Sequence, residues 1–230
     1  MSAPVRPVVT FDVFSALVDS RRGGARVFDA WSRERHWLVP GAEVYDRWDE
    51  LNKRSHRDVA TWLPYAELAG AALEMAYAQL DLHGDPKADS TALLDSMVDW
   101  PLWPDVEDGL SELAGRFRLG VLSNIDDDLL ARTHVRTLPV DPEAVVTSER
   151  VRAYKPSPTF YAEAERLLGS YVHVASSARD VRGALEAGVR VVRLRRPGHG
   201  VDPDGPTPPR QATSTVGLAV TLLAAKEAGD

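Results

Sequence analysis

The sequence predicts an α/β protein: a Rossmann-like, doubly wound parallel sheet forms the core, and a helical cap domain is inserted into it. Two observations support this prediction. From about Pro101 onward, short runs of β-branched and aliphatic residues alternate with amphipathic helical stretches, as in parallel sheets covered on both faces. From about Ser20 to Trp100 the chain has helical periodicity but no convincing strand, which indicates an all-helical insertion after the first strand.

The predicted strands are continuous apolar runs, as expected when both faces of a sheet are buried. They span Val8–Phe14, Arg118–Leu122, Ala144–Thr147, Tyr171–Ala175 and Val189–Leu194. Helices are expected over Gly109–Arg116, Asp127–Arg132, Pro158–Leu168 and Asp180–Ala187, and a closing helix near Thr215–Ala228 follows a Pro/Gly-rich surface loop at 195–214. Because crossovers between parallel strands are right-handed, these units predict one doubly wound sheet.

The insertion is expected to lie over the ligand site. Its helices are predicted over Ala25–Trp37, Ala42–Arg57 and Tyr65–Leu80, with breaks at 38–41 and 82–90. The predicted division is therefore a core of residues 1–19 and 101–230 and a cap of residues 20–100. Ligands of such sheets bind beyond the carboxyl ends of the strands, where the insertion leaves the first strand.

The composition narrows the classes of function. The chain has 230 residues and a formal net charge of −7, which argues against a nucleic-acid or anionic-membrane partner. It has no cysteine, so disulfides, thiolate metal ligands and a cysteine nucleophile are excluded. The amino-terminal segment lacks the apolar stretch of a signal peptide, and no run approaches a membrane span in length. A cytoplasmic location is expected.

Asp12 is a charged residue at the exit of the first predicted strand. A carboxylate in that place is paired, bound to a metal or chemically active, because an isolated buried charge is too costly. A simple turn or helix cap is the structural alternative.

Further polar residues stand where other predicted strands end or helices begin. Ser123 and Asn124 follow the second strand, Lys155 precedes a helix, and Asp180 follows the strand at 171–175. A lysine can hold a nucleophilic carboxylate ionised, hydroxyl and amide groups can bind an anionic substrate, and a second carboxylate can orient water. The structural alternatives are a surface lysine at 155 and helix caps at 123–124 and 180.

The order and spacing of these residues resemble the haloacid dehalogenase superfamily. Its pattern is an Asp ending the first strand, a Ser or Thr ending the second, a Lys, and acidic residues after the last core strand. Leu-Ser-Asn at 122–124, Tyr-Lys-Pro at 154–156 and the Ser-rich segment 174–188 are most similar to the 2-haloacid dehalogenase branch. The resemblance covers nearly the whole chain.

Two positions distinguish this branch from the phosphatases of the superfamily. Phe14 and Ala175 stand where the phosphatases carry a leaving-group acid and a Mg²⁺-binding Asp, and an octahedral Mg²⁺ site lacking an oxygen ligand is poorly formed. The resemblance thus implies metal-independent hydrolysis of a small 2-haloacid through an aspartyl ester, with no cofactor. The alternatives are a Mg²⁺-dependent phosphate-ester hydrolase and an inactive binding relative. The latter is favoured by Ala175 and by Ser-Ala-Leu at 15–17, where the branch has Gly-Thr-Leu.

The resemblance also implies a role for each site residue. Asp12, Lys155 and Asp180 are the implied catalytic residues. The implied substrate-binding residues are Ser123, Asn124, Tyr161, Ser177 and Phe14, together with a cap arginine for the halide, either Arg54 or, as second choice, Arg57. The implied partner is a small anionic organic substrate, and the resemblance is also compatible with a homodimer.

Two other features are interpreted as structural. The acidic run Asp126–Asp128 is expected to be a solvated first helical turn, which the helix dipole favours. The six histidines show no metal-ligand spacing and are assigned to the core or the surface: 36, 56, 83, 134, 173 and 199.

Overall fold

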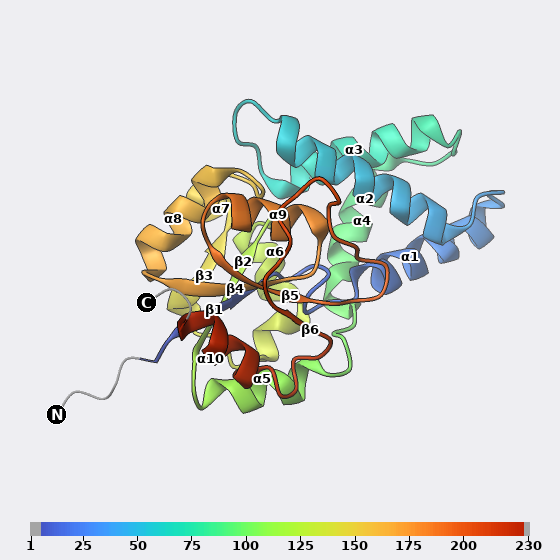
Figure 1. Cartoon of the computed structure of the whole chain (residues 1–230). Helices are drawn as coiled ribbons and strands as arrows, with labels where there is room; N and C mark the ends of the chain where they lie inside the picture. Colours follow the sequence, from blue (N-terminus) through green and yellow to red (C-terminus); the bar gives the residue numbers. More distant parts are fainter. Residues whose placement is uncertain (1–5, 228–230) are drawn as a thin grey trace.

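The computed structural model describes residues 6–227, and its centre is a six-stranded parallel sheet (Figure 1). The strands are β1 (Val8–Phe11), β2 (Arg118–Ser123), β3 (Val145–Thr147), β4 (Tyr171–Ala175), β5 (Arg190–Leu194) and β6 (Gln211–Ala212). Their order is β3-β2-β1-β4-β5-β6, and every neighbouring pair is parallel. The strand order changes direction between β1 and β4, so the crevice beyond their carboxyl ends is the expected ligand site. The predicted fold class is confirmed.

Helices cover both faces of the sheet, because successive strand residues point to opposite sides. Val9 and Phe11 pack with residues of α5, α6 and α10, whereas Val8 and Ala175 pack with residues of α8 and α9. Figure 1 shows α5 and α10 on one side of the sheet and α8 and α9 on the other. The helices outside the insertion are α5 (Val106–Ala114), α6 (Asp127–Arg132), α7 (Ser148–Val151), α8 (Pro158–Leu168), α9 (Ala178–Glu186), α10 (Ala219–Glu227) and the 3₁₀ helices η2 (His134–Thr137) and η3 (Pro142–Ala144).

Residues 20–99 contain helices and no strand in the described structure. They form α1 (Ser20–Arg35), α2 (Gly41–Asp58), α3 (Tyr65–Gln79), α4 (Pro86–Asp95) and the 3₁₀ helix η1 (Ser96–Asp99). Helix α4 was missed in the sequence, where 82–90 was interpreted as a break. The helix begins there because the Asp85 side chain accepts hydrogen bonds from two backbone amides of the first turn and proline is tolerated at that position. The division into a core and a cap stays a prediction.

Helix α1 begins five residues earlier than expected and runs through the pair Gly23-Gly24. A Cβ atom at Gly23 would lie 2.4 Å from Trp100 Cγ, and one at Gly24 would lie 2.3 Å from Tyr45 Cδ2. The glycines cost helix propensity, but they let two aromatic side chains pack directly against the backbone of α1. Tyr45 and Trp100 both line the pocket described below.

Asp126 joins the helical insertion to the rest of the chain. Its two carboxylate oxygens accept hydrogen bonds from the backbone amides of Tyr65 and Ala66, at 2.8 and 3.0 Å, at the start of α3. Asp126 is buried, so the expectation of a solvated turn is wrong for this residue. The carboxylate satisfies free amides at a helix start, where negative charge is stabilised.

The remaining differences from the predicted elements are shifted ends and short elements that were not predicted, namely α7, η2, η3 and β6. Strand β1 stops at Phe11 rather than Phe14, and the expected surface loop at 195–214 contains the short strand β6. The closing helix is α10, and the predicted end of that helix, Ala228, lies outside the described residues. Among residues 6–227, no helix combines the length and the apolar character needed to cross a membrane.

Candidate active site

A tight turn after β1 presents Asp12 at the carboxyl edge of the sheet. The Asp12 amide donates to the carbonyl of Val174 in β4 at 2.9 Å, and the amides of Leu17 and Val18 both donate to the carbonyl of Val13. Ser15 completes the turn with a positive φ of 77°. Asp12 therefore lies between β1 and β4, where the strand order changes direction.

The Lys155 ammonium connects Asp12 to Asp180. Lys155 Nζ lies 2.8 Å from Asp12 Oδ1, 2.5 Å from Asp180 Oδ2 and 2.7 Å from the carbonyl oxygen of Leu122. The three charged side chains are buried. An ammonium group has three donors, and all three of these find an acceptor.

The two carboxylates share one buried cation, but their pKa values shift in opposite directions. Burial raises the pKa of Asp12 above its ordinary value, and the charge of Asp180 adds to this effect while Lys155 opposes it. Burial also acts to raise the pKa of Asp180, but Lys155 and His173 lower it below its ordinary value. Burial acts to lower the pKa of Lys155, but the two carboxylates raise it. Asp12 is therefore the more basic carboxylate of the pair.

His173 and Tyr161 fix the orientation of Asp180. The Tyr161 hydroxyl donates to Asp180 Oδ1 at 2.8 Å, and His173 Nε2 lies 3.1 Å from Asp180 Oδ2. The other ring nitrogen of His173 lies 3.0 Å from the Thr10 hydroxyl. His173 is not among the predicted site residues. Its signal was a polar residue inside an apolar strand, on the face that includes Ala175 at the strand end.

Ser15 contacts the second oxygen of Asp12. Its hydroxyl donates to Asp12 Oδ2 at 3.2 Å. Ala16 stands where the 2-haloacid dehalogenase branch has Thr, so the hydroxyl of that Thr is absent here. The preceding residue, Ser15, supplies a hydroxyl to the nucleophile in its place.

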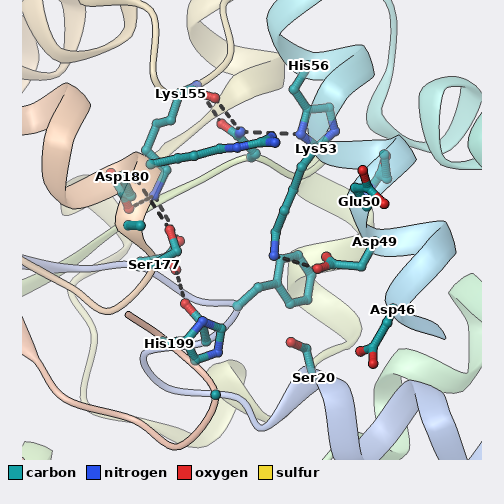
Figure 2. Close-up of a pocket in the computed structure, with 18 of the residues that line it drawn as sticks. Ser20, Asp46, Asp49, Glu50, Lys53, His56, Lys155, Ser177, Asp180 and His199 are labelled. Carbon is teal, nitrogen blue, oxygen red and sulfur yellow. Dashed lines mark hydrogen bonds and ion pairs between the residues drawn. The ribbon is translucent and has the colours of Figure 1, made fainter. Parts of the chain in front are cut away.

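A cavity of about 440 Å³ opens in front of Asp12, between the sheet edge and α2. In Figure 2, Lys155, Ser177 and Asp180 lie on one side of it, and Asp49, Lys53 and His56 of α2 lie on another. The wall contains many aromatic rings: Phe14, Tyr45, Trp48, His56, Tyr65, Trp100 and His199. Pockets of this size hold small organic molecules.

Six of the predicted site residues line this cavity, and the side chains of two of them, Asn124 and Ser177, are hydrogen-bonded to backbone groups. Asp12, Phe14, Asn124, Lys155, Ser177 and Asp180 all line it. The Asn124 side-chain amide donates to the Lys155 carbonyl at 2.9 Å and accepts from the Lys155 amide at 2.7 Å. Ser177 caps α9 by accepting from the Asp180 amide. The alternative that Asp180 itself caps this helix is therefore wrong.

The other predicted residues lie outside the wall. Tyr161 reaches Asp180 from α8, behind the pocket. Ser123 is fully buried, and its hydroxyl has no hydrogen-bond partner among residues 6–227. Arg54 and Arg57 are exposed on α2, and neither lines the cavity. The wall instead carries two basic side chains that the sequence analysis did not select, Lys53 and Arg179.

The family model for haloacid dehalogenase-like hydrolases matches residues 7–188. A curated relative, haloacetate dehalogenase H-2 of Moraxella sp. (strain B), is 28% identical over 207 residues, which cover 87% of this chain and 90% of the relative.

Solved structures show the same architecture. An L-2-haloacid dehalogenase crystal structure is 25% identical and superposes with a TM-score of 0.77, covering 95% of this chain and 99% of the other. The L-2-haloacid dehalogenase of Xanthobacter autotrophicus with chloropropionic acid covalently bound is 21% identical, with a TM-score of 0.79 and coverage of 96% and 98%. The second likeness shows the fold alone. The family resemblance inferred from the motifs is confirmed.

Proposed function

The chain belongs to the haloacid dehalogenase-like hydrolase family, and we propose that this hydrolase removes halide from a small 2-haloacid without a metal ion. The observation that carries the proposal is the buried Lys155 ammonium, which lies 2.8 Å from Asp12 and 2.5 Å from Asp180. A cation in this place holds Asp12 ionised and aligned.

In the first step, a carboxylate oxygen of Asp12 attacks C2 of the substrate. The new C–O bond forms as the carbon–halogen bond breaks, and the halide leaves with the bonding electron pair. The product of this step is an ester between Asp12 and the 2-hydroxy acid. The raised pKa of Asp12 supports this role because a more basic carboxylate is the better nucleophile when ionised.

In the second step, water hydrolyses the ester. Asp180 orients a water toward Cγ of Asp12, and the water oxygen adds there. The ester C–O bond then breaks, one proton of the water passes to the leaving oxygen, and the other is released to solvent. The 2-hydroxy acid leaves with the oxygen that Asp12 supplied, and the carboxylate of Asp12 is restored. Formation of the ester removes the charge of Asp12, so Lys155 then pairs with Asp180 alone. Tyr161 and His173 hold Asp180 in place.

The relatives support this choice of substrate. The curated relative is a haloacetate dehalogenase, and the structural neighbour at 25% identity is an L-2-haloacid dehalogenase. The replacement of Gly-Thr-Leu by Ser-Ala-Leu at 15–17 was an argument for an inactive relative. The hydroxyl of Ser15 weakens this argument because it contacts the nucleophile. The cavity of about 440 Å³ leaves room for acids larger than chloropropionate.

Product assays with and without metal test the proposal. We expect halide release from 2-chloropropionate or from a 2-halo acid with a longer or aromatic side chain, at the same rate in EDTA and in Mg²⁺. The parallel substrate is p-nitrophenyl phosphate. Phosphate release that requires Mg²⁺, without halide release in EDTA, would replace the proposal with a phosphate-ester hydrolase. Failure of both reactions with ligand binding retained would indicate the inactive relative.

Substitutions at Ser15 separate catalysis from backbone strain. We expect Ser15→Ala and Ser15→Gly to lower kcat for halide release by a similar factor of about 3 to 10, because both remove a hydrogen bond of about 1 kcal/mol. Ser15→Gly should be about 1 kcal/mol more stable than Ser15→Ala, since only glycine adopts a positive φ without strain. Kinetics and urea denaturation measure the two effects. Equal kcat in wild type and both variants would remove Ser15 from the site.

A further inference from the structure

A second pocket lies beside the active site, at the carboxyl ends of β5 and β6. It has a volume of about 400 Å³, and no acidic residue lines it. Its polar wall is formed by Arg193, Arg195, Arg196, His199, Gln211 and Thr213. The chain as a whole carries a formal net charge of −7. A basic pocket in such a chain attracts a negatively charged ligand locally.

The pairing of β5 with β6 places two of the arginines on one face of the sheet edge. Arg193 is opposite Gln211 in the parallel register. The Arg195 amide donates to the carbonyl of Ala212 at 2.8 Å, so the pairing continues past the end of β5. Side chains alternate along a strand, and Leu194 between the two arginines is fully buried in the core. Both guanidinium groups therefore belong to the same side, at the wall of the pocket.

The charges of these two arginines are not compensated by a carboxylate within residues 6–227. Arg193 donates to neutral oxygens, at 2.9 Å to Gln211 Oε1 and at 2.8 Å to the carbonyl of His199. Its Nε is buried and has no acceptor in the described structure, although buried donors are nearly always hydrogen-bonded. Arg195 is exposed, and the third arginine of the wall is already paired with a carboxylate. The pocket thus offers a ligand two free positive charges and a buried donor.

We propose that this pocket binds a phosphate group. Two uncompensated cations match a dianion, and both inorganic phosphate and phosphate monoesters approach two negative charges near pH 7. A guanidinium donates parallel hydrogen bonds to neighbouring phosphate oxygens, and Gln211 and Thr213 supply neutral donors from the other strand. The volume of about 400 Å³ holds a phosphate with a small organic group attached to it. This inference is independent of the proposed function, which concerns the cavity in front of Asp12.

His199 connects the phosphate pocket to the active site, because it lines both cavities (Figure 2). Burial lowers the pKa of His199, the charges of Lys53 and Arg193 add to this effect, and two carboxylates oppose it. The positive potential of Arg193 therefore reaches the active-site wall. A phosphate that compensates Arg193 removes this potential. Occupancy of the pocket should then weaken the binding of an anion in front of Asp12.

Titration with inorganic phosphate tests the pocket directly. We expect wild type to bind phosphate and Arg195→Gln to bind it about 10-fold more weakly, because the change removes a charge-assisted hydrogen bond. Arg193→Lys keeps the charge but not the buried Nε donor, and it should lose about 3- to 10-fold. Arg210→Gln is the matched control, since Arg210 precedes Gln211 and does not line the pocket. It should bind within about 2-fold of wild type. Isothermal titration calorimetry measures each affinity, and circular dichroism verifies the fold.

Two further ligands identify the chemistry that the pocket recognises. Methyl phosphate that binds at least as tightly as inorganic phosphate would identify a phosphate ester as the ligand, and a preference for inorganic phosphate would identify the free anion. Both results support the proposal. Succinate has two negative charges but no phosphate group. Succinate binding as tight as that of phosphate would show a general dianion site and overturn the assignment to phosphate.

Propionate, the halogen-free analogue of 2-chloropropionate, separates the two cavities. With increasing phosphate, we expect the affinity for propionate to fall to a plateau about 2- to 5-fold below its initial value, because the two anions interact only electrostatically. A fall without a plateau would place phosphate in front of Asp12 and overturn the proposal. Absence of phosphate binding by wild type, or unchanged affinity in both Arg195→Gln and Arg193→Lys, would overturn it as well. These titrations do not measure halide release, so a failure of the proposed function would leave their interpretation unchanged.

Discussion

Asp12→Asn should lower kcat for halide release by at least about 10⁴-fold, since removal of a covalent nucleophile leaves only the contributions of binding and orientation. Asparagine has the same shape and can still accept a hydrogen bond from Lys155 Nζ, now 2.8 Å from Asp12 Oδ1. The fold and the affinity for propionate should therefore persist. Asp128→Asn, the same change at an exposed carboxylate of α6, should retain wild-type activity. Steady-state halide release is the measurement.

Oxygen labelling in the wild-type enzyme separates the ester from direct attack by water. In a single turnover in ¹⁸O-water with enzyme in excess, the proposed steps place the label in the carboxylate of Asp12 and leave the hydroxy acid unlabelled. Label in the hydroxy acid would mean that water attacks C2, with Asp12 acting as a base. Full activity of Asp12→Asn would refute both schemes.

Most of the site on the sheet side could be predicted because it follows from short patterns and one topological fact. Asp12, Asn124 and Asp180 each come shortly after a strand, and a parallel sheet brings the carboxyl ends of its strands to one edge. Lys155 was identified by its motif, and the structure places its ammonium between Asp12 and Asp180. These contacts could be predicted without knowing how the helices pack.

The side of the site formed by α2 was harder to predict because a helix can turn any of its faces inward. Helix α2 directs Tyr45, Trp48, Asn52 and His56 to the pocket, at spacings of three and four residues. Arg54 is two residues from His56, on a different face, and is exposed. The resemblance implied an arginine on this helix, but it did not determine which face of the helix turns inward.

Other features depended on contacts between segments far apart in the chain. The sequence alone gave no sign that Asp126 would cap a helix some sixty residues earlier, or that Gly23 would leave room for Trp100. The free Nε donor of Arg193 is a further case. Whether a buried polar group has a partner depends on every segment around it, which no local pattern contains.

Lys155→Met should reduce the free energy of unfolding by about 3–5 kcal/mol at pH 8, because removal of one partner leaves uncompensated charge in the interior. Asp12 and Asp180 would face each other in a buried site without their shared cation. Lys53→Met removes the other lysine of the pocket, whose pair with Asp49 is partly exposed, and should cost about 1 kcal/mol or less. Urea denaturation of the two variants gives the comparison.

The pH dependence of this loss identifies its electrostatic origin. Without Lys155, the pKa of one carboxylate in the folded variant rises further above its unfolded value, so the folded variant takes up a proton as the pH falls toward 5. Proton uptake by the folded state stabilises it, and the gap between Lys155→Met and wild type should narrow from pH 8 to pH 5. Adding Asp12→Asn to Lys155→Met removes one of the two charges and should restore about 1–3 kcal/mol at pH 8 while reducing the narrowing. A gap that stays constant with pH and is unaffected by Asp12→Asn would mean that Lys155 stabilises the fold through packing of its alkyl chain. The assignment of Lys155 as the cation that keeps Asp12 ionised would then fail.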